Sequence, residues 1–302
     1  MAKIQRNEPA ASGGKGTLSV DKSLSRTQRS GVSGTAPEDR LPKVTIDGEE
    51  FWRVEGDYLL DVDQLFIYTQ QQAALREAVR LGENAAGTAE VALSDSFVGV
   101  SSELVGILQG SKIVRWSPGT TLTYCVLRKT FNDQAQYEEI AANMQTATRA
   151  WEETCGIKFE YRNDLDGSDS LRPPVVFPVR LVDASGAFIA AAFFPNDIVN
   201  RRRLLIDPSY FTTGFDHVGV LRHELGHTLG FRHEHIRSLA PRVCPDEDST
   251  DTIDLSAYDP KSVMHYFCGG VGSRDLAITD VDRAGSQKVY GPPFTSFELI
   301  DA

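Results

Sequence analysis

The chain has 302 residues, of which 41% are hydrophobic and 24% charged, the proportions of an ordinary globular protein. Its formal net charge of −11 argues against a nucleic acid or an anionic membrane as partner. No apolar run approaches the ~18 residues that a transmembrane helix needs. No apolar region follows the slightly basic start, Met1–Arg6, so no secretory signal peptide is visible.

Residues 1–45 form the first segment. They are rich in Gly, Ser, Thr, Lys and Arg and have no hydrophobic period. Such a composition cannot bury enough apolar surface to order itself. We therefore predict a disordered N-terminal tail over these residues.

The second segment, residues 46–112, contains short patterned pieces. Phe51-Trp52 begins an extended stretch, and Gly56-Asp57 predicts a turn. A helix is expected from Asp61, with Gly82 as its stop. Its apolar residues at helical spacing are Leu65, Tyr68, Leu75 and Val79. Residues 83–110 are small and weakly patterned.

The third segment, residues 113–302, alternates strand and helix patterns. Strands are predicted over residues 121–127, 157–161, 175–182 and 188–194. Asn132 is the expected cap of a helix with one apolar face, made of Tyr137, Ile140, Met144, Ala147 and Trp151. Strand, helix and strand in succession predict a crossover in a mostly parallel sheet. Further on, Thr279–Asp282 opens a last short helix that Gly291 stops.

A second helix is expected in the stretch over residues 216–235, immediately after the fourth predicted strand. Asp216 is its expected N-cap, and Gly230 stands where it would end in a left-handed residue. His223 and His227 are four apart and project from one face, while His233 follows the turn. Three histidines with one open position are the ligand set of a catalytic zinc.

Glu224 lies between the two helical histidines. It is placed to act as a general base toward water activated by the metal, without binding the metal itself. The alternative is a helix with surface histidines and an accidental H-E-x-x-H. The glycine and the third histidine in register disfavour that alternative.

The motif H-E-x-x-H-x-x-G-x-x-H is the metzincin signature, and Glu234 directly after the third histidine resembles its astacin variant. Ser262–Tyr266, S-V-M-H-Y, is similar to the astacin Met-turn. The resemblance implies that Met264 forms an apolar floor beneath the metal. It also implies that Tyr266 is a detachable zinc ligand that stabilises the oxyanion, and that Glu234 pairs with a new N-terminus once a propeptide is removed.

The resemblance covers residues 113–291 and implies an α+β, zincin-like fold. Such a fold has a mostly parallel twisted sheet, an active-site helix and a smaller C-terminal subdomain, and its edge strand, here 188–194, pairs with substrate. Val54–Asp57, V-E-G-D, is similar to the F-x-G-D element of astacin propeptides, although Val54 replaces the aromatic residue. Asp57 is thus a candidate zinc ligand of a latent form, and residues 46–112 a propeptide-like segment ahead of a catalytic domain over 113–302. A simple turn at Gly56-Asp57 is the alternative.

Four cysteines, 125, 155, 244 and 268, allow three pairings among which the sequence does not choose. Cys155 matches a family cysteine whose usual partner near the C-terminus is absent. The preferred pairing joins Cys125 to Cys155 and Cys244 to Cys268, with four reduced thiols as the alternative. The acidic stretch over residues 163–170 resembles a calcium loop, but Val175 stands where a bidentate glutamate is needed, so we expect a solvated loop.

The sequence therefore predicts a zinc-dependent endopeptidase resembling the astacins, made as a latent zymogen, with Zn²⁺ as cofactor. The expected partner is a protein or peptide substrate, with no nucleic acid and no membrane, and the expected state is a monomer. The family resemblance suggests an extracellular location. Three alternatives stay open: a matrixin-like metzincin, against which Glu234 and Tyr266 speak, a non-catalytic binding protein on the same scaffold, and a protease effector or toxin delivered without a signal peptide.

Overall fold

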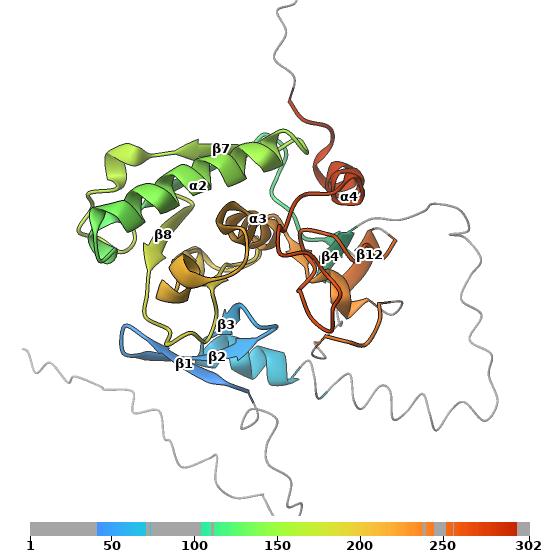
Figure 1. The fold of residues 1–302 in the computed structure, drawn as a ribbon, viewed down its shortest axis with the longest axis horizontal. Coiled ribbons are helices and arrows are strands. Elements are labelled where there is room, and N and C mark those ends of the chain that lie inside the picture. The colour runs from blue at the N-terminus through green and yellow to red at the C-terminus, as the bar shows by residue number, and fades with distance from the viewer. Residues whose placement is uncertain are drawn as a thin grey trace, which may run out of the picture.

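The computed structural model describes residues 41–70, 73, 104–109, 112–237, 240–244, 252–255 and 257–294 (Figure 1). Most of the predicted tail, and the predicted helix positions Leu75, Val79 and Gly82, lie outside these residues. Within the described residues, no helix is long and apolar enough to cross a membrane.

A five-stranded sheet in the order β7-β6-β8-β10-β9 forms the centre of the fold. Its strands are β6 (Thr121–Val126), β7 (Lys158–Tyr161), β8 (Phe177–Leu181), β9 (Ala190–Ala191) and β10 (Leu204–Ile206). The pairs β6–β7, β6–β8 and β8–β10 are parallel, and only the edge strand β9 runs antiparallel to its neighbour. The predicted α+β class with a mostly parallel sheet is confirmed.

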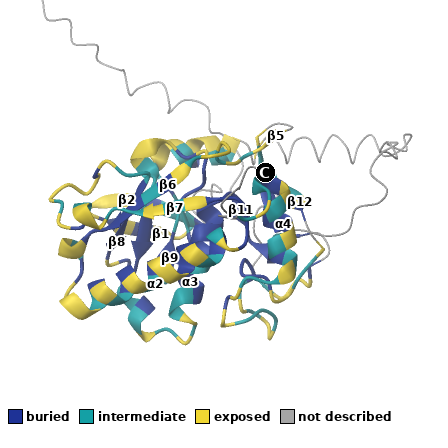
Figure 2. Ribbon diagram, turned by 90° about the horizontal axis from the view of Figure 1, so that it is seen from above, coloured by how far each residue is buried: buried dark blue, intermediate teal, exposed yellow. Residues whose placement is uncertain are grey.

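Helix α2 (Gln134–Glu152) provides the crossover between β6 and β7. Its N-cap is Asp133, one residue after the predicted Asn132, and the Asp133 side chain accepts from the Gln136 N–H. The predicted apolar face is buried, and Figure 2 shows the opposite face of the helix exposed. Trp151 lies at the end of the buried face, and its indole N–H donates to the carbonyl of Arg222 in the next helix.

That next helix is α3 (His217–Thr228), which packs against α2 and lies below it in Figure 1. The predicted strand 188–194 is shorter than expected, because the Phe194 N–H donates to the carboxylate of Asp197 instead of continuing a ladder. This strand does not come immediately before α3 as predicted. Strand β10 and the 3₁₀ helix η5 (Pro208–Thr212) lie between them.

A second sheet is built around β4 (Leu104–Gln109), which pairs with β5 (Lys112–Ile113), β11 (Phe231–Arg232) and β12 (Thr252–Leu255). The first four residues of β4 are buried. This strand therefore packs with the chain that follows α3, although it lies upstream of the predicted domain boundary at residue 113. Helix α4 (Asp280–Tyr290) completes this side of the molecule, with the predicted capping box and the predicted stop at Gly291.

Residues 43–60 form a separate small sheet of β1 (Lys43–Ile46), β2 (Glu49–Val54) and β3 (Tyr58–Leu60). Strand β1 begins inside the predicted 1–45 tail. Residues 62–70 are helical, and the Asp61 side chain accepts from the Gln64 N–H at their start. In Figure 1 this segment lies on the side of the molecule opposite α2. We call residues 41–70 the prosegment from here on.

One of the two preferred disulfides forms. Cys244 is bonded to Cys268, whereas Cys125 and Cys155 are buried free thiols, so that pairing is wrong. The reason is strand alternation. Tyr124 and its even-numbered neighbours pack in the core cluster that contains Cys155, whereas Cys125 points to the other face of the sheet.

The other 3₁₀ helices among the described residues are η2 (Arg128–Thr130), η3 (Asn163–Leu165), η4 (Val199–Arg201) and η6 (Glu234–Ile236). The acidic loop at η3 was expected to be solvated, but one of its carboxylates is not. Asp166 is buried and accepts from the Val126 N–H at 2.8 Å and from the Tyr137 hydroxyl at 2.6 Å. It ties this loop to the central sheet.

Candidate active site

Helix α3 carries the first two histidines on its buried face. The side chain of Asp216 accepts from the Gly219 N–H at 2.6 Å and so fixes the start of the helix. At the other end, Gly230 has φ +94°, and a Cβ there would lie 2.9 Å from the carbonyl oxygen of Val114. Only glycine allows the chain to turn this closely, and the turn brings His233 back toward His223 and His227.

The three imidazoles and one carboxylate meet in a buried cluster. One ligand atom from each of Asp57, His223, His227 and His233 lies within 4.8 Å of the others. The Nε2 atoms of His227 and His233 are 3.1 Å apart. Two nitrogens converge in this way on the place of a shared cation.

Backbone carbonyls fix two of the rings. Nδ1 of His223 lies 2.7 Å from the Val263 oxygen, and Nδ1 of His227 lies 2.8 Å from the Phe231 oxygen. Because these nitrogens donate, each Nε2 keeps its lone pair for a metal. Burial lowers the pKa of His227 to about 4, which keeps it neutral near pH 7.

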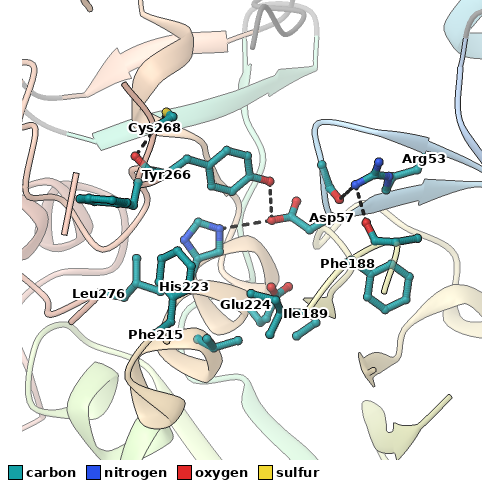
Figure 3. Close-up of a pocket in the computed structure, with 15 residues that line it drawn as sticks. Arg53, Asp57, Phe188, Ile189, Phe215, His223, Glu224, Tyr266, Cys268 and Leu276 are labelled. Atoms are coloured by element: carbon teal, nitrogen blue, oxygen red, sulfur yellow. Dashed lines mark hydrogen bonds and ion pairs between the residues drawn. The ribbon is translucent and has the colours of Figure 1, made fainter. Parts of the chain in front are cut away.

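Asp57 enters the cluster from the hairpin between β2 and β3. Its Oδ2 is 3.2 Å from His233 Nε2 and 3.4 Å from His223 Nε2, and its Oδ1 is 3.6 Å from His227 Nε2. Burial by itself would raise the pKa of Asp57, but the interaction of its carboxylate with the adjacent imidazoles, that of His233 above all, holds that pKa well below its ordinary value. The predicted turn is thus present, and its aspartate lies among the three histidines. Figure 3 shows Asp57 between His223 and Tyr266.

Tyr266 faces the same carboxylate from the other side. Its hydroxyl is 2.8 Å from Asp57 Oδ2 and 2.6 Å from the Glu55 carbonyl oxygen. A Cβ at Gly56 would lie 2.3 Å from that hydroxyl, so a glycine is required in this turn. Tyr266 contacts the carboxylate that sits among the histidines.

Met264, the expected apolar floor beneath the metal, packs against α3. It is fully buried, and a Cβ at Gly226 would lie 2.2 Å from its sulfur. The turn that holds Met264 is anchored by Asp282 of α4, which accepts from the Ser262 hydroxyl at 2.5 Å and the Val263 N–H at 2.9 Å. Sequence reasoning found Asp282 only as a capping residue, since nothing in its local pattern indicates the distant turn.

Glu224 is buried beside the cluster and is not one of its ligands. Burial raises the pKa of Glu224 well above its ordinary value, and the charge of Asp57 raises it further. Its Oε2 has no hydrogen-bond partner among the described residues, and neither do Asp57 Oδ1 and His223 Nε2. Buried polar atoms without partners are costly. A nitrogen and oxygen donor set of this kind, with two rings fixed from behind, fits zinc.

The prosegment fills the space in front of these residues. Tyr58 forms a parallel bridge with Ala192, next to the edge strand β9, and its hydroxyl donates to Asp197 at 3.0 Å. Arg232 donates to Glu55 in a buried ion pair. Arg53 donates to the carbonyl oxygens of Gly56 and Ala187. Sequence reasoning did not identify these contacts, because all but that of Arg53 with Gly56 join positions more than a hundred residues apart.

A cavity of about 360 Å³ opens beside Glu224 and His223. Its walls are mainly apolar, and Figure 3 shows Phe188, Ile189, Phe215 and Leu276 around it. Arg53 of the prosegment lies along its edge. With the prosegment in place, the charged or titratable side chains that line the cavity are Arg53, Asp57, His223, Glu224 and Tyr266.

Glu234, the expected partner of a new N-terminus, is fully buried. Its Oε1 accepts from Arg237 Nη1 at 2.7 Å and from the Asp259 N–H at 2.9 Å. Its Oε2 has no partner among the described residues. Burial raises the pKa of Glu234 to about 7.

The matrixin family model matches residues 115–257, which include α3 and the three histidines. Two solved structures of myroilysin are similar to the chain. One is 16% identical with a TM-score of 0.43, over 58% of this chain and 95% of that chain. The other is 15% identical with a TM-score of 0.40, over 58% and 85%. High choriolytic enzyme 1, a hatching enzyme zinc-protease from the medaka fish Oryzias latipes, is 19% identical with a TM-score of 0.39, over 57% of this chain and 90% of that chain.

The family match, together with the fold and the histidine cluster, supports a zinc metalloprotease of the metzincin class. The match names the matrixins within that class. The astacin subtype expected from the sequence stays a proposal.

Proposed function

We propose that the chain is an astacin-type zinc endopeptidase made as a latent zymogen. The observation that carries this proposal is the buried cluster of three imidazoles, with Glu224 beside it and Asp57 inserted into it. The matched segment ends at residue 257 and does not include the Met-turn. Tyr266, beside the cluster, supports the astacin type over a matrixin.

His223, His227 and His233 would hold the metal through Nε2. Zinc, when bound, supplies Lewis acidity that polarises a carbonyl and makes water acidic enough to attack near neutral pH. Glu224 takes the proton of the attacking water and delivers it to the leaving amine. Its buried carboxylate, with a raised pKa, suits a group that must both accept and return a proton.

Tyr266 would act as a hydrogen-bond donor to the oxyanion that forms on the substrate. In the latent form its hydroxyl is engaged by Asp57 and the Glu55 carbonyl. Removing the prosegment would free the hydroxyl to turn toward substrate. A preorganised donor of this kind is typically worth ~10²-fold or more in turnover.

Latency would come from Asp57 and the chain around it. The carboxylate lies among the three imidazoles, where water and substrate would have to enter. Glu55 and Tyr58 hold this turn in place through Arg232 and Asp197. The inhibitory unit is therefore the β2–β3 hairpin as a whole, and Asp57 is its tip.

The substrate would be a protein or peptide with a large apolar side chain next to the cleaved bond. The cavity beside Glu224 is walled by Phe215, Val220 and Leu276. Once Arg53 leaves with the prosegment, no lysine or arginine among the described residues remains in the cavity lining. An acidic side chain would therefore find no lysine or arginine to pair with there.

We also propose that the protein acts as a monomer outside the cell. The Cys244–Cys268 disulfide supports export, because such bonds persist in oxidising compartments. If Cys244 and Cys268 are free thiols in the native protein, that result would argue instead for an effector that works inside a cell.

The test is digestion of a mixed peptide library by chain that was folded at full length and then cut between residues 73 and 104. We expect cleavage of internal bonds next to large apolar residues, lost on zinc chelation. Release of terminal residues only would contradict an endopeptidase. Zinc binding without any cleavage would indicate a non-catalytic binding protein on the same scaffold.

A further inference from the structure

The prosegment also covers a face of the central sheet outside the cleft. Three of its apolar side chains, Val44, Ile46 and Phe51, are buried in a cluster separate from the main core. The catalytic part supplies the other side of this cluster. Together with two nearby arginines we call these residues the docking face: Val182, Ala184, Phe188, Ala191, Leu205, Arg180 and Arg203.

The docking face is cationic as well as apolar. Arg180, whose side chain is 8% exposed, pairs with Asp47 at 2.5 Å, and the Arg203 guanidinium lies 4.9 Å from the centre of the Phe51 ring. Arg180 and Arg203 line one cavity, and burial, together with the charge of Arg180, lowers the pKa of Arg203. The chain as a whole has a net charge of −11, so this positively charged part of its surface differs in sign from the whole.

The segment seated on this face has complementary chemistry. Between Thr45 and Phe51 it reads T-I-D-G-E-E-F, with three carboxylates and one aromatic ring. Asp47 and Gly48 form the tip of the β1–β2 hairpin, both with positive φ, so that Asp47 is delivered to Arg180 by the turn. A cavity of about 390 Å³, lined by Arg172, Arg180 and Arg203, is left beside this segment.

The docking face adjoins the cleft. Phe188 belongs both to the docking face and to the lining of the cavity beside Glu224. One continuous piece of the prosegment, from Asp47 to Asp57, occupies the face and the histidine cluster together. A substrate chain in the cleft can therefore reach the docking face without leaving the surface.

We propose that, in the processed enzyme, the docking face is an exosite that binds an acidic, aromatic-containing segment of the protein substrate. This rests on the proposed function, since the face becomes accessible only when the prosegment leaves. Such a segment satisfies the two guanidiniums and covers the apolar residues, as residues 45–51 do in the latent form. The exosite selects protein substrates by a sequence remote from the cleaved bond.

The experiment uses full-length chain with an N-terminal affinity tag and a site-specific protease sequence inserted between residues 73 and 104. The chain is folded, then cut, and the tagged segment is removed. Three peptides share one cleavable core: the core alone, the core linked to T-I-D-G-E-E-F, and the core linked to T-I-N-G-Q-Q-A. The linked peptides are made with the extension on either end.

For one of the two placements we expect kcat/KM to rise about tenfold or more with the acidic extension, through KM, as expected for a tethered second contact. The neutral extension should give no gain. Arg180→Ala should bring the ratio of extended to core peptide toward one. The matched control Arg149→Ala, an exposed arginine on α2, should keep the ratio.

Equal kcat/KM for the acidic, neutral and core peptides would overturn the exosite. So would a gain that survives in Arg180→Ala. If Arg180→Ala does not fold, the comparison of acidic with neutral extension in wild-type enzyme still decides. Failure to cleave even the core peptide would count against the proposed protease function and is thus distinguishable.

Discussion

Replacing Asp57 by alanine in the full-length chain should relieve latency without a cut. The carboxylate is buried, accepts from the Tyr266 hydroxyl at 2.8 Å and lies 3.2–3.6 Å from three imidazoles. Truncating one partner of a buried, hydrogen-bonded charge pair typically costs about 2–5 kcal/mol. That cost falls on the closed state only, because in the open state Asp57 is in water.

At about 1.4 kcal/mol per factor of ten, the lower bound raises the open population about 30-fold. Glu55–Arg232, Tyr58–Asp197 and the docking face still hold the prosegment, so the activity should stay below that of the cut chain. Asp57→Asn keeps a hydrogen-bond acceptor but loses the charge and should fall between wild type and Asp57→Ala.

The assay is steady-state cleavage of a short peptide by full-length proteins at equal, measured zinc content. Asp63→Ala is the matched control, since that prosegment carboxylate is 84% exposed. Wild-type activity in Asp57→Ala, with zinc bound and the fold intact, would refute the view that Asp57 blocks the site. Full activity in uncut wild type would mean that the prosegment is an accessory region and Gly56-Asp57 only a turn.

Three further predictions concern the metal, the tyrosine and the disulfide. We expect one zinc per chain in the wild type, and His227→Ala should lose most of it, as measured by elemental analysis. Full zinc occupancy in the variant would contradict the assignment of His227 as a ligand. Tyr266→Phe in cut enzyme should lower kcat ~10²-fold with KM little changed, whereas an unchanged kcat would leave Tyr266 a packing residue. Replacing Cys244 and Cys268 by serine should lower the free energy of unfolding by about 3 kcal/mol, as measured by denaturant titration. The reason is that the disulfide restricts the unfolded chain by closing a loop between cysteines 24 positions apart. No change in the denaturation midpoint would contradict that estimate.

Local signals in the sequence were sufficient to predict helix α3 and its surroundings. Asp216 and Gly230 mark its ends by capping and by positive φ, and both act on residues near them in the chain. The alternation of strand and helix patterns similarly predicted the parallel part of the sheet. These features depend on spacing, which a single sequence displays.

Features that depend on distant partners were missed or wrong. β10 is three residues long, too short to show a periodicity of its own, and it directly follows three arginines. β4 was missed because two of its three partners, β11 and β12, lie more than a hundred residues further along the chain. The Cys125–Cys155 pairing failed because a one-residue difference in a strand reverses the face of the side chain.

The residues of the site also fall into two groups, those that a local motif predicts and those that depend on distant partners. The histidines and Glu224 share one motif and could be read together. The ion pairs Arg180–Asp47 and Arg232–Glu55 join residues more than a hundred positions apart, and neither member is unusual in its local sequence. The sequence therefore did not predict the docking face, which is defined by the contacts that the prosegment makes in the folded structure.

The most direct test of a zinc endopeptidase is the effect of Glu224→Ala on cleavage at unchanged zinc content. Wild-type and variant chains are folded at full length, cut, matched for bound zinc and assayed on one apolar core peptide. We expect the variant to keep its zinc and to lose turnover by a factor of ~10²–10⁴, the usual contribution of a general base. Undiminished cleavage by the zinc-loaded variant would contradict the central claim.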